Sequence, residues 1–181
     1  IFLDIDGVLN RTKAATHIRL DDDLVHRFVG LVKATGASVV LSTFWRPFQT
    51  YLQYCLHRYG LPPGAVIGRT PGLSGASSFA NGSGGEQLFS SSAFDNSQYA
   101  SRASEIGAWL DAHPAVTHYV ILDDRPSAAD TRLMPHFVQT DSNIGLTEED
   151  ALRCSQLLSQ GHIEAMSGKG SIAEYVVGDQ D

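Results

Sequence analysis

Several features that would place a protein in a large functional class are missing from this sequence. It has no apolar run of about 18 residues, so we expect no membrane-spanning helix. Its two cysteines, Cys55 and Cys154, are far apart and form no C-x-x-C pair, which favours free thiols in a reducing compartment and predicts a cytoplasmic protein. Its histidines show no H-x-H or H-E-x-x-H spacing, which argues against a zinc site. The net charge of −7 argues against a broad nucleic-acid-binding surface.

The hydrophobic pattern predicts one α/β domain. With 181 residues, 43% of them apolar, the chain is long enough for one sizeable core. Short apolar runs alternate with helical patterns of about ten to fifteen residues, which favours a three-layer, Rossmann-like parallel sheet flanked by helices. The expected strands are residues 1–5, 37–41, 65–67, 117–122 and 136–139, and the expected helices begin near residues 21, 47, 101 and 147.

Two stretches depart from this alternation. Residues 68–98 are rich in Gly, Ser and Asn and contain only isolated apolar residues. We expect them to form a long loop insert, either functional or disordered, within a domain that spans residues 1–160. Residues 161–181 are weakly periodic, and we expect them to form a peripheral C-terminal tail.

Acidic and hydroxyl side chains stand at the C-terminal ends of three expected strands. Asp4 and Asp6 follow the first strand, Ser42 follows the second, and the pair Asp123-Asp124 follows a later one. Ligands of parallel sheets bind beyond these strand ends, so we expect the side chains to share one site. Because alternate strand residues point to the same side, Asp4 and Asp6 are expected to project together. Carboxylate oxygens at this density suit Mg²⁺.

The string D-I-D-G-V-L-N at residues 4–10 resembles the first motif of the haloacid dehalogenase (HAD) superfamily, whose members are mostly Mg²⁺-dependent phosphatases. The resemblance implies an HAD-like fold and a phosphohydrolase that forms an aspartyl-phosphate intermediate. It implies that Asp4 is the nucleophile and that Asp6 is the general acid and base, with a backbone carbonyl that also reaches the metal. Both aspartates therefore belong to the expected metal site.

Two further strings are similar to the second and fourth HAD motifs. Ser42, directly after the apolar residues 39–41, matches the hydroxyl residue that binds the transferring phosphoryl group, and Thr43 beside it joins the expected phosphate site. The pair Asp123-Asp124 matches the acidic fourth motif. The resemblance implies direct Mg²⁺ contact for Asp124 and a supporting metal role for Asp123.

The third motif of the family is a Lys or Arg, and here two arginines compete for it. No lysine lies between Ser42 and Asp123. Arg102 opens the helix that leads to the acidic pair, which is the position that the family pattern prefers; its alternative is a solvated helix-terminal arginine. Arg46 begins another helix, where backbone N–H groups favour anions, so we expect a second phosphate contact there. The alternative for Arg46 is a structural ion pair.

Further strings narrow the resemblance to one branch of the superfamily. They are L-S-T-F-W-R at 41–46, R-x-x-E-I-x-x-W-L at 102–110 and G-L-T-x-x-D-A at 145–151, and they look like the HAD domain of Swiss Army Knife RNA-repair proteins. The gap at residues 10–20 is too short for a folded cap, and residues 68–98 are too polar for one. We therefore expect no full cap domain and an accessible active site.

Three functions remain open at this point. The first is a Mg²⁺-dependent phosphatase that acts on phosphorylated substrates, either small phosphoesters or a nucleic-acid end. The second is a phosphatase that heals the 3′ ends of RNA or DNA in a repair system. The third is a non-catalytic HAD-like binding module, which the presence of Asp4, Asp6, Asp123 and Asp124 disfavours. The oligomeric state is left open.

Overall fold

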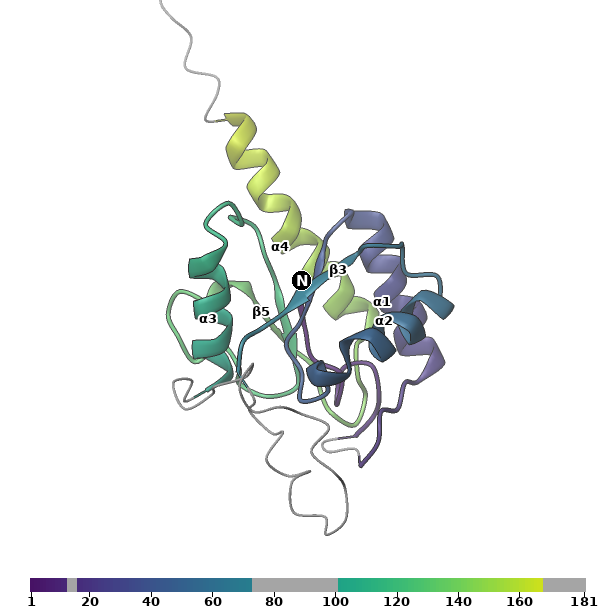
Figure 1. Cartoon of the computed structure of the whole chain (residues 1–181). Coiled ribbons are helices and arrows are strands. Elements are labelled where there is room, and N and C mark those ends of the chain that lie inside the picture. The colour runs from purple at the N-terminus through teal and green to yellow at the C-terminus, as the bar shows by residue number, and fades with distance from the viewer. Residues whose placement is uncertain (13–15, 73–100, 168–181) are drawn as a thin grey trace, which may run out of the picture.

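The central element of the fold is an open, five-stranded parallel sheet with strand order β3-β2-β1-β4-β5 (Figure 1). The computed structural model describes residues 1–12, 16–72 and 101–167. The strands are β1 (Phe2–Leu3), β2 (Val39–Leu41), β3 (Val66–Arg69), β4 (Ile121–Asp123) and β5 (Phe137–Gln139). The predicted α/β architecture is confirmed, and the strand that precedes the D-I-D-G string lies in the middle of the sheet.

Capping residues explain where some of the helices begin and end. They are α1 (Asp22–Thr35), α2 (Gln49–Arg58), α3 (Arg102–Ala112) and α4 (Glu148–Ser167), with short 3₁₀ helices at Arg46–Phe48 and Met134–His136. Gly36 ends α1 with a φ of 64°, a left-handed conformation in which glycine has no Cβ to clash. At the start of α4, the Thr147 hydroxyl accepts from the backbone N–H of Asp150, and the Asp150 carboxylate accepts from the backbone N–H of Thr147.

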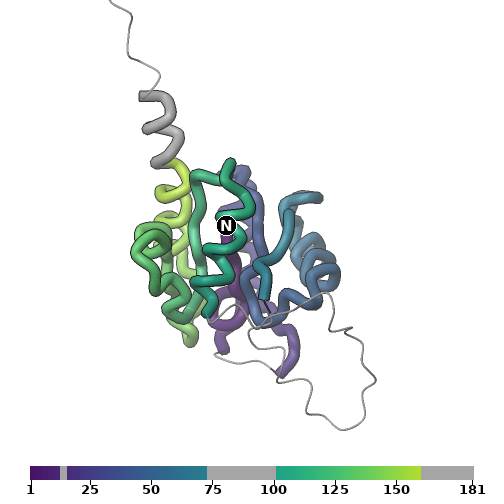
Figure 2. The backbone as a smooth tube through the Cα atoms, turned by 60° about the vertical axis from the view of Figure 1, so that its left-hand side comes forward, coloured from purple at the N-terminus to yellow at the C-terminus, as the bar shows by residue number. Residues whose placement is uncertain are grey.

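The sheet has a different apolar core on each face. Leu3, Leu41 and Leu122 point into a core with residues of α1, α2 and α4. Phe2, Val40 and Ile121 point into a second core with Ile106, Trp109 and Leu110 of α3. Figure 2 brings α3 forward, in front of the sheet, and shows α1 behind it. This is the alternation expected of buried strands, in which successive side chains point to opposite faces.

The strand register explains why the polar residues meet on the side of α3. Leu3 is level with Leu41 on one side and with Leu122 on the other. The next residues along these three strands are Asp4, Ser42 and Asp123, which continue the row that packs against α3. Because α3 runs antiparallel to the strands, its first turn lies over this end of the row (Figure 1). The first residue of α3, Arg102, is therefore directed toward the three strand ends.

Several predicted boundaries are wrong in detail. β1 and β4 have only two and three residues, shorter than the predicted 1–5 and 117–122. β3 continues to Arg69, so the predicted insert cannot begin at residue 68. The rest of that insert lies outside the described residues from residue 73 onward. The predicted domain boundary at residue 160 falls inside α4, which continues to Ser167, and residues 168–181 of the predicted tail lie outside the described part.

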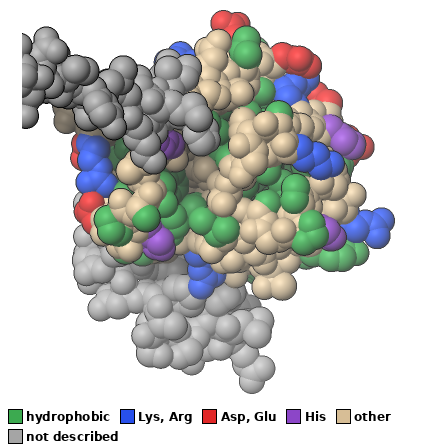
Figure 3. Space-filling model, turned by 90° about the horizontal axis from the view of Figure 1, so that it is seen from above, with side chains coloured by type: hydrophobic (Ala, Val, Ile, Leu, Met, Phe, Trp, Pro, Cys, Tyr) green, Lys and Arg blue, Asp and Glu red, His purple; other side chains and the backbone are tan. Residues whose placement is uncertain are grey.

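The end of the sheet where the strands begin is less charged. A hollow of about 550 Å³ opens there, lined by residues at the start of the strands, at the end of α1, on α4 and around Trp109 of α3. Figure 3 shows this end of the molecule, with hydrophobic and uncharged side chains in the middle of the view and charged ones mainly toward the rim. Among the described residues, no helix has both the length and the apolar character needed to span a bilayer.

Candidate active site

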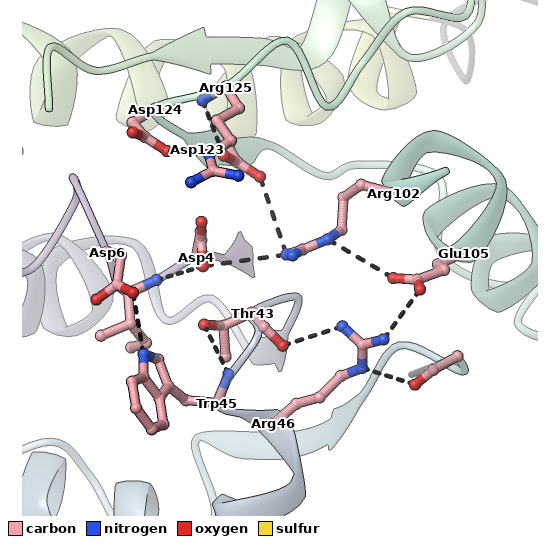
Figure 4. Close-up of polar contacts among 12 residues, drawn as sticks. Asp4, Asp6, Thr43, Trp45, Arg46, Arg102, Glu105, Asp123, Asp124 and Arg125 are labelled. Atoms are coloured by element: carbon pink, nitrogen blue, oxygen red, sulfur yellow. Dashed lines mark hydrogen bonds and ion pairs between the residues drawn. The ribbon is translucent and has the colours of Figure 1, made fainter. Parts of the chain in front are cut away.

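Three carboxylates meet at the C-terminal edge of the sheet (Figure 4). Asp4 follows β1, Asp123 is the last residue of β4, and Asp124 comes next, with one oxygen of each within 4.8 Å of the others. Asp4 is 7% exposed and Asp123 is 3% exposed. Buried carboxylates at this spacing repel one another, so a cation between them is favourable.

Burial is the main cause that raises the pKa of each of these carboxyl groups. The pKa of Asp4 rises to about 7, because burial disfavours the charged form and Asp123 lies beside it, while Arg102 and Thr43 oppose the rise. Burial likewise raises the pKa of Asp123, which Arg102 opposes. The pKa of Asp124 is raised by burial and then by the charge of Asp4. Without a cation, the cluster therefore retains protons at pH values where an exposed aspartate has lost them.

A tight turn after β1 makes room for Asp124. Gly7 has a φ of 72°, and a Cβ at this residue would lie 2.6 Å from the Cβ of Asp124. The backbone N–H of Gly7 donates to Oδ1 of Asn10 at 3.1 Å, and the hydroxyl of Thr140 donates to the carbonyl of Gly7 at 2.7 Å. Glycine is required here because it alone combines the left-handed conformation with the missing side chain.

Asp6 lies beside the carboxylate cluster rather than in it. Its Oδ1 accepts a hydrogen bond from Nδ2 of Asn10 at 2.8 Å. Its Oδ2 accepts one from Nε1 of Trp45 at 3.1 Å (Figure 4). The expectation that Asp4 and Asp6 project together from one strand is wrong, because β1 ends at Leu3 and both residues lie in the connection that follows. The metal contact expected for the backbone carbonyl of Asp6 stays a prediction.

Asn10 holds the connection after β1 together. It is fully buried, and its Nδ2 donates to the carbonyl of Arg19 at 2.9 Å as well as to Asp6. Sequence reasoning gives Asn10 no role, although it ends the D-I-D-G-V-L-N string. The signal was its side-chain amide, which is able to accept from Gly7 and donate to Asp6 across one turn.

The two hydroxyl residues predicted to bind phosphate lie at the end of β2. Ser42 is 2% exposed, and its Oγ is buried without a hydrogen bond to any described residue. Thr43 is fully buried, and its hydroxyl accepts from the backbone N–H of Trp45 at 3.3 Å and opposes the pKa rise of Asp4. The Ser42 hydroxyl thus has hydrogen-bonding capacity left for a ligand, whereas the Thr43 hydroxyl accepts a bond in the turn and interacts with Asp4.

Arg102 reaches from α3 to the carboxylates. Its Nη1 lies 4.0 Å from Oδ1 of Asp4 and 4.0 Å from Oδ2 of Asp123 (Figure 4). This nitrogen is buried and makes no hydrogen bond to a described residue. The structure therefore places Arg102 between the first and fourth motifs and excludes the alternative of a solvated helix-terminal arginine, since its side chain is only 18% exposed.

Arg46 occupies a different position, where it is paired within the protein, and the phosphate contact expected of it stays a prediction. It is 2% exposed, and its Nη2 donates to Oε1 of Glu105 at 2.9 Å. Its Nη1 donates to the carbonyl of Thr43 and its Nε to the carbonyl of Gly72, both at 3.0 Å. Every guanidinium nitrogen thus has a protein partner, and burial lowers the pKa of Arg46 to about 10. The structure supports the alternative of a structural ion pair.

Glu105 is a site residue to which the sequence reasoning assigns no role, although it is the glutamate of the R-x-x-E-I-x-x-W-L string. It is fully buried on α3, with Oε1 toward Arg46 and Oε2 3.6 Å from Nε of Arg102. The available signal was a charged residue on the apolar face of α3, directly before Ile106 and three positions after Arg102. A buried charge on such a face requires a partner, which the sequence pattern does not name.

The donor set fits a divalent cation that prefers oxygen ligands. Three carboxylates face one enclosed cationic side chain, Arg102, since Arg46 is paired with Glu105. Arg125 approaches Asp124 to 3.9 Å but is 67% exposed, so solvent screens it. The Oδ1 atom of Asp124 is buried and accepts no hydrogen bond from a described residue. The carboxylates of Asp4, Asp123 and Asp124 are thus the available ligands.

A comparison with known proteins gave one match. The family model described as "HAD domain in Swiss Army Knife RNA repair proteins" matches residues 1–151. No curated protein and no solved structure matches the chain. The matched range begins with β1 and reaches into α4, so it contains every site residue described above.

Proposed function

Because the chain belongs to the family of HAD domains found in Swiss Army Knife RNA repair proteins, we propose that it is a Mg²⁺-dependent phosphohydrolase that cleaves phosphate monoesters through an aspartyl-phosphate on Asp4. The observation that carries the proposal is the meeting of Asp4, Asp123 and Asp124 with Arg102 at one edge of the sheet. Carboxylates fit a divalent cation, and an arginine fits a phosphate. A phosphate dianion and its cation are therefore both accommodated beside the nucleophile.

The reaction has two displacements at phosphorus. A carboxylate oxygen of Asp4 attacks the phosphorus atom, the bond from phosphorus to the ester oxygen breaks, and Asp6 donates a proton to the leaving oxygen. Asp6 then takes a proton from water, whose oxygen attacks the phosphorus of the aspartyl-phosphate. The bond between phosphorus and the Asp4 oxygen breaks, which releases inorganic phosphate and restores both carboxyl groups.

Each remaining residue has one task in this scheme. Asp4, Asp123 and Asp124 would supply the oxygens that hold Mg²⁺, which when bound would provide positive charge to balance the phosphoryl group. Arg102 binds the phosphoryl oxygens from the side of α3, and the Ser42 hydroxyl donates to another of them. The indole N–H of Trp45 and the side-chain amide of Asn10 donate to Asp6 and hold its carboxylate on the side away from Arg102.

A more specific second candidate is hydrolysis of a 3′-phosphate at an RNA or DNA end. The description of the matching family, which concerns RNA repair proteins, favours it. The net charge of −7 counts against a large nucleic-acid footprint and limits the contact to the phosphorylated end.

The test is phosphate release from p-nitrophenyl phosphate and from oligonucleotides with a 3′-phosphate or a 5′-phosphate. We expect release that Mg²⁺ supports and that EDTA abolishes. Asp4→Asn, which has the same shape but no nucleophilic oxygen pair, should reduce kcat by at least about 10⁴-fold. Full activity of Asp4→Asn would refute the aspartyl-phosphate mechanism, and an inactive wild type with bound Mg²⁺ would favour a binding module. Preference for the 3′-phosphate over both other substrates would favour end healing.

A further inference from the structure

We infer that Glu105 is a positioning residue that holds Arg102 at the phosphate side of the site. The inference rests on the proposed function, because it assigns Arg102 to phosphate binding. It concerns a residue that contacts neither the carboxylate cluster nor the expected phosphate. Glu105 is instead the shared partner of two arginines, Arg46 on one side and Arg102 on the other (Figure 4).

The side of Glu105 that faces Arg46 is rigidly fixed. Oε1 accepts from Nη2 of Arg46 at 2.9 Å, and neither side chain is more than 3% exposed. Arg46 is itself fixed by the carbonyls of Thr43 and Gly72. Gly72 has a φ of 98°, and a Cβ at this residue would collide with the Glu105 carboxylate. The carboxylate therefore lies between the connection after β2 and the connection after β3.

The second carboxylate oxygen of Glu105 lies near Arg102, the arginine that we propose binds phosphate. Oε2 lies 3.6 Å from Nε of Arg102, while Nη1 of Arg102 lies 4.0 Å from both Asp4 and Asp123. The two ends of one guanidinium thus face opposite carboxylate groups. Attraction to Asp4 and Asp123 favours movement of Arg102 onto the nucleophile, where a bidentate pair would form. Glu105 provides the opposing attraction at Nε, and Nη1, which has no hydrogen-bond partner among the described residues, keeps its N–H groups for a phosphoryl oxygen.

Charge accounts for the presence of both arginines. A single buried glutamate beside Arg102 would neutralise it and weaken its attraction for phosphate. Since Arg46 balances Glu105, the pair is neutral as a unit, and the positive charge of Arg102 remains available to the ligand. Glu105 therefore orients Arg102 without cancelling its charge.

A double-mutant cycle tests this role. Glu105→Gln keeps the shape but removes the charge that holds Nε, and Arg102→Met removes the guanidinium. We expect Glu105→Gln to reduce kcat/KM on the order of 100-fold when Arg102 is present, since a shift of about 1 Å at a catalytic contact has such an effect. In the Arg102→Met background, the same change should reduce kcat/KM less than about threefold. Equal losses in both backgrounds would overturn the inference. Glu148→Gln, at an exposed glutamate, is the matched control and should change nothing.

A second variant separates positioning from stability. Arg46→Met with Glu105→Leu replaces the buried ion pair by apolar side chains of similar size, an exchange that often preserves stability. This protein should have a Tm close to that of the wild type and still lose activity as Glu105→Gln does. Recovery of activity together with Tm would show that Glu105 is only structural.

Phosphate binding tests the inference apart from turnover. The affinity of the wild type and the three variants of the cycle for inorganic phosphate with Mg²⁺ is measured by calorimetry. Glu105→Gln should weaken binding about tenfold only where Arg102 is present. If the wild type binds phosphate but hydrolyses nothing, the proposed function fails while this cycle still decides the role of Glu105. If the wild type binds no phosphate, or if Glu105→Gln leaves its affinity unchanged, the inference is overturned.

Discussion

The two sides of the site contain charges that are all largely shielded from solvent but are differently paired. On the side of α3 and the 3₁₀ helix before α2, Arg46 and Glu105 form a close ion pair, and the carbonyls of Thr43 and Gly72 each accept a further hydrogen bond from the guanidinium. On the side of β1 and β4, three carboxylates face each other with one arginine at 4.0 Å. On the first side, the charges of Arg46 and Glu105 balance each other within the protein. On the second side, the carboxylates carry more negative charge than Arg102 balances, so a bound cation is attracted there.

This difference shows that burial alone does not separate structural from functional charges. A buried ion pair with full hydrogen bonding contributes little net free energy, but the loss of one partner leaves an unpaired charge. A cluster of like charges lowers the stability of the free protein, and that loss is recovered when a cation or phosphate binds. Whether a buried charge has a close partner within the protein therefore separates structural from functional charges. Arg46 has such a partner in Glu105 and Arg102 has none at that distance, so substitution of each arginine tests this distinction.

The largest expected effect on stability comes from removing one partner of the ion pair between Arg46 and Glu105. Arg46→Met leaves Glu105 buried without its 2.9 Å partner, so the free energy of unfolding should fall by about 3 to 5 kcal/mol. Arg102→Met removes an arginine that makes no close ion pair within the described residues, so its effect should be below about 1 kcal/mol. Urea unfolding measures both values. Equal losses would show that the two arginines do not differ in the way the distances indicate.

The fold was largely predictable from the sequence because its determinants are local. Alternation of apolar runs with helical patterns gave the parallel sheet, Gly36 marked the end of α1, and Thr147 with Asp150 marked the start of α4. Strand lengths were less predictable, because β1 stops after Leu3 and the chain continues as a buried connection with the same apolar character. Apolar composition reports burial, and it does not report where backbone pairing ends.

The site was predictable where side chains sit at strand ends, and it was not where partners come from elsewhere. Asp4, Ser42 and Asp123 follow from the strand register. Arg46 and Arg102 look alike in sequence, since both open helices, and only the position of Glu105 between them distinguishes their roles. Contacts between residues 46 and 105 depend on how α2 and α3 approach the sheet, which no local pattern specifies.

The carboxylate cluster of Asp4, Asp123 and Asp124 should also make the stability of the metal-free protein depend on pH. Burial raises the pKa of Asp4 to about 7, whereas an unfolded aspartate has a pKa of 3.8, so the folded protein holds an extra proton between these values. Stability should therefore fall as pH rises from 4 to 7 and level off above, by a few kcal/mol at most. In EDTA, the Tm of Asp4→Asn relative to wild type should increase over the same interval, since asparagine does not titrate. A constant difference would contradict the raised pKa.

Added Mg²⁺ should stabilise the folded protein, because it would balance the charges of Asp4, Asp123 and Asp124, as Arg46 and Glu105 balance each other. At a concentration about 100-fold above its Kd, binding to the folded state adds about 2.7 kcal/mol to the free energy of unfolding. For a chain of this size, that corresponds to a Tm increase of roughly 5 to 10 °C. Asp124→Asn, which removes a buried oxygen without a hydrogen-bond partner among the described residues, should lose most of the increase, while Arg46→Met with Glu105→Leu should keep it. No increase in the wild type at millimolar Mg²⁺ would argue against the carboxylates as a cation site.

The smallest expected effect concerns Asp6, which belongs to neither side. Its carboxylate is held by neutral donors, Nε1 of Trp45 at 3.1 Å and Nδ2 of Asn10 at 2.8 Å. Trp45→Phe removes the first of these, a hydrogen bond of about 1 kcal/mol, and should lower kcat about fivefold. Because Trp45 also packs against Phe44 and Phe48, lost packing would lower Tm in any background, whereas the kcat effect should vanish when Asp6 is already Asn. A kcat loss that persists in Asp6→Asn would mean that Trp45 acts through packing rather than through its hydrogen bond to Asp6.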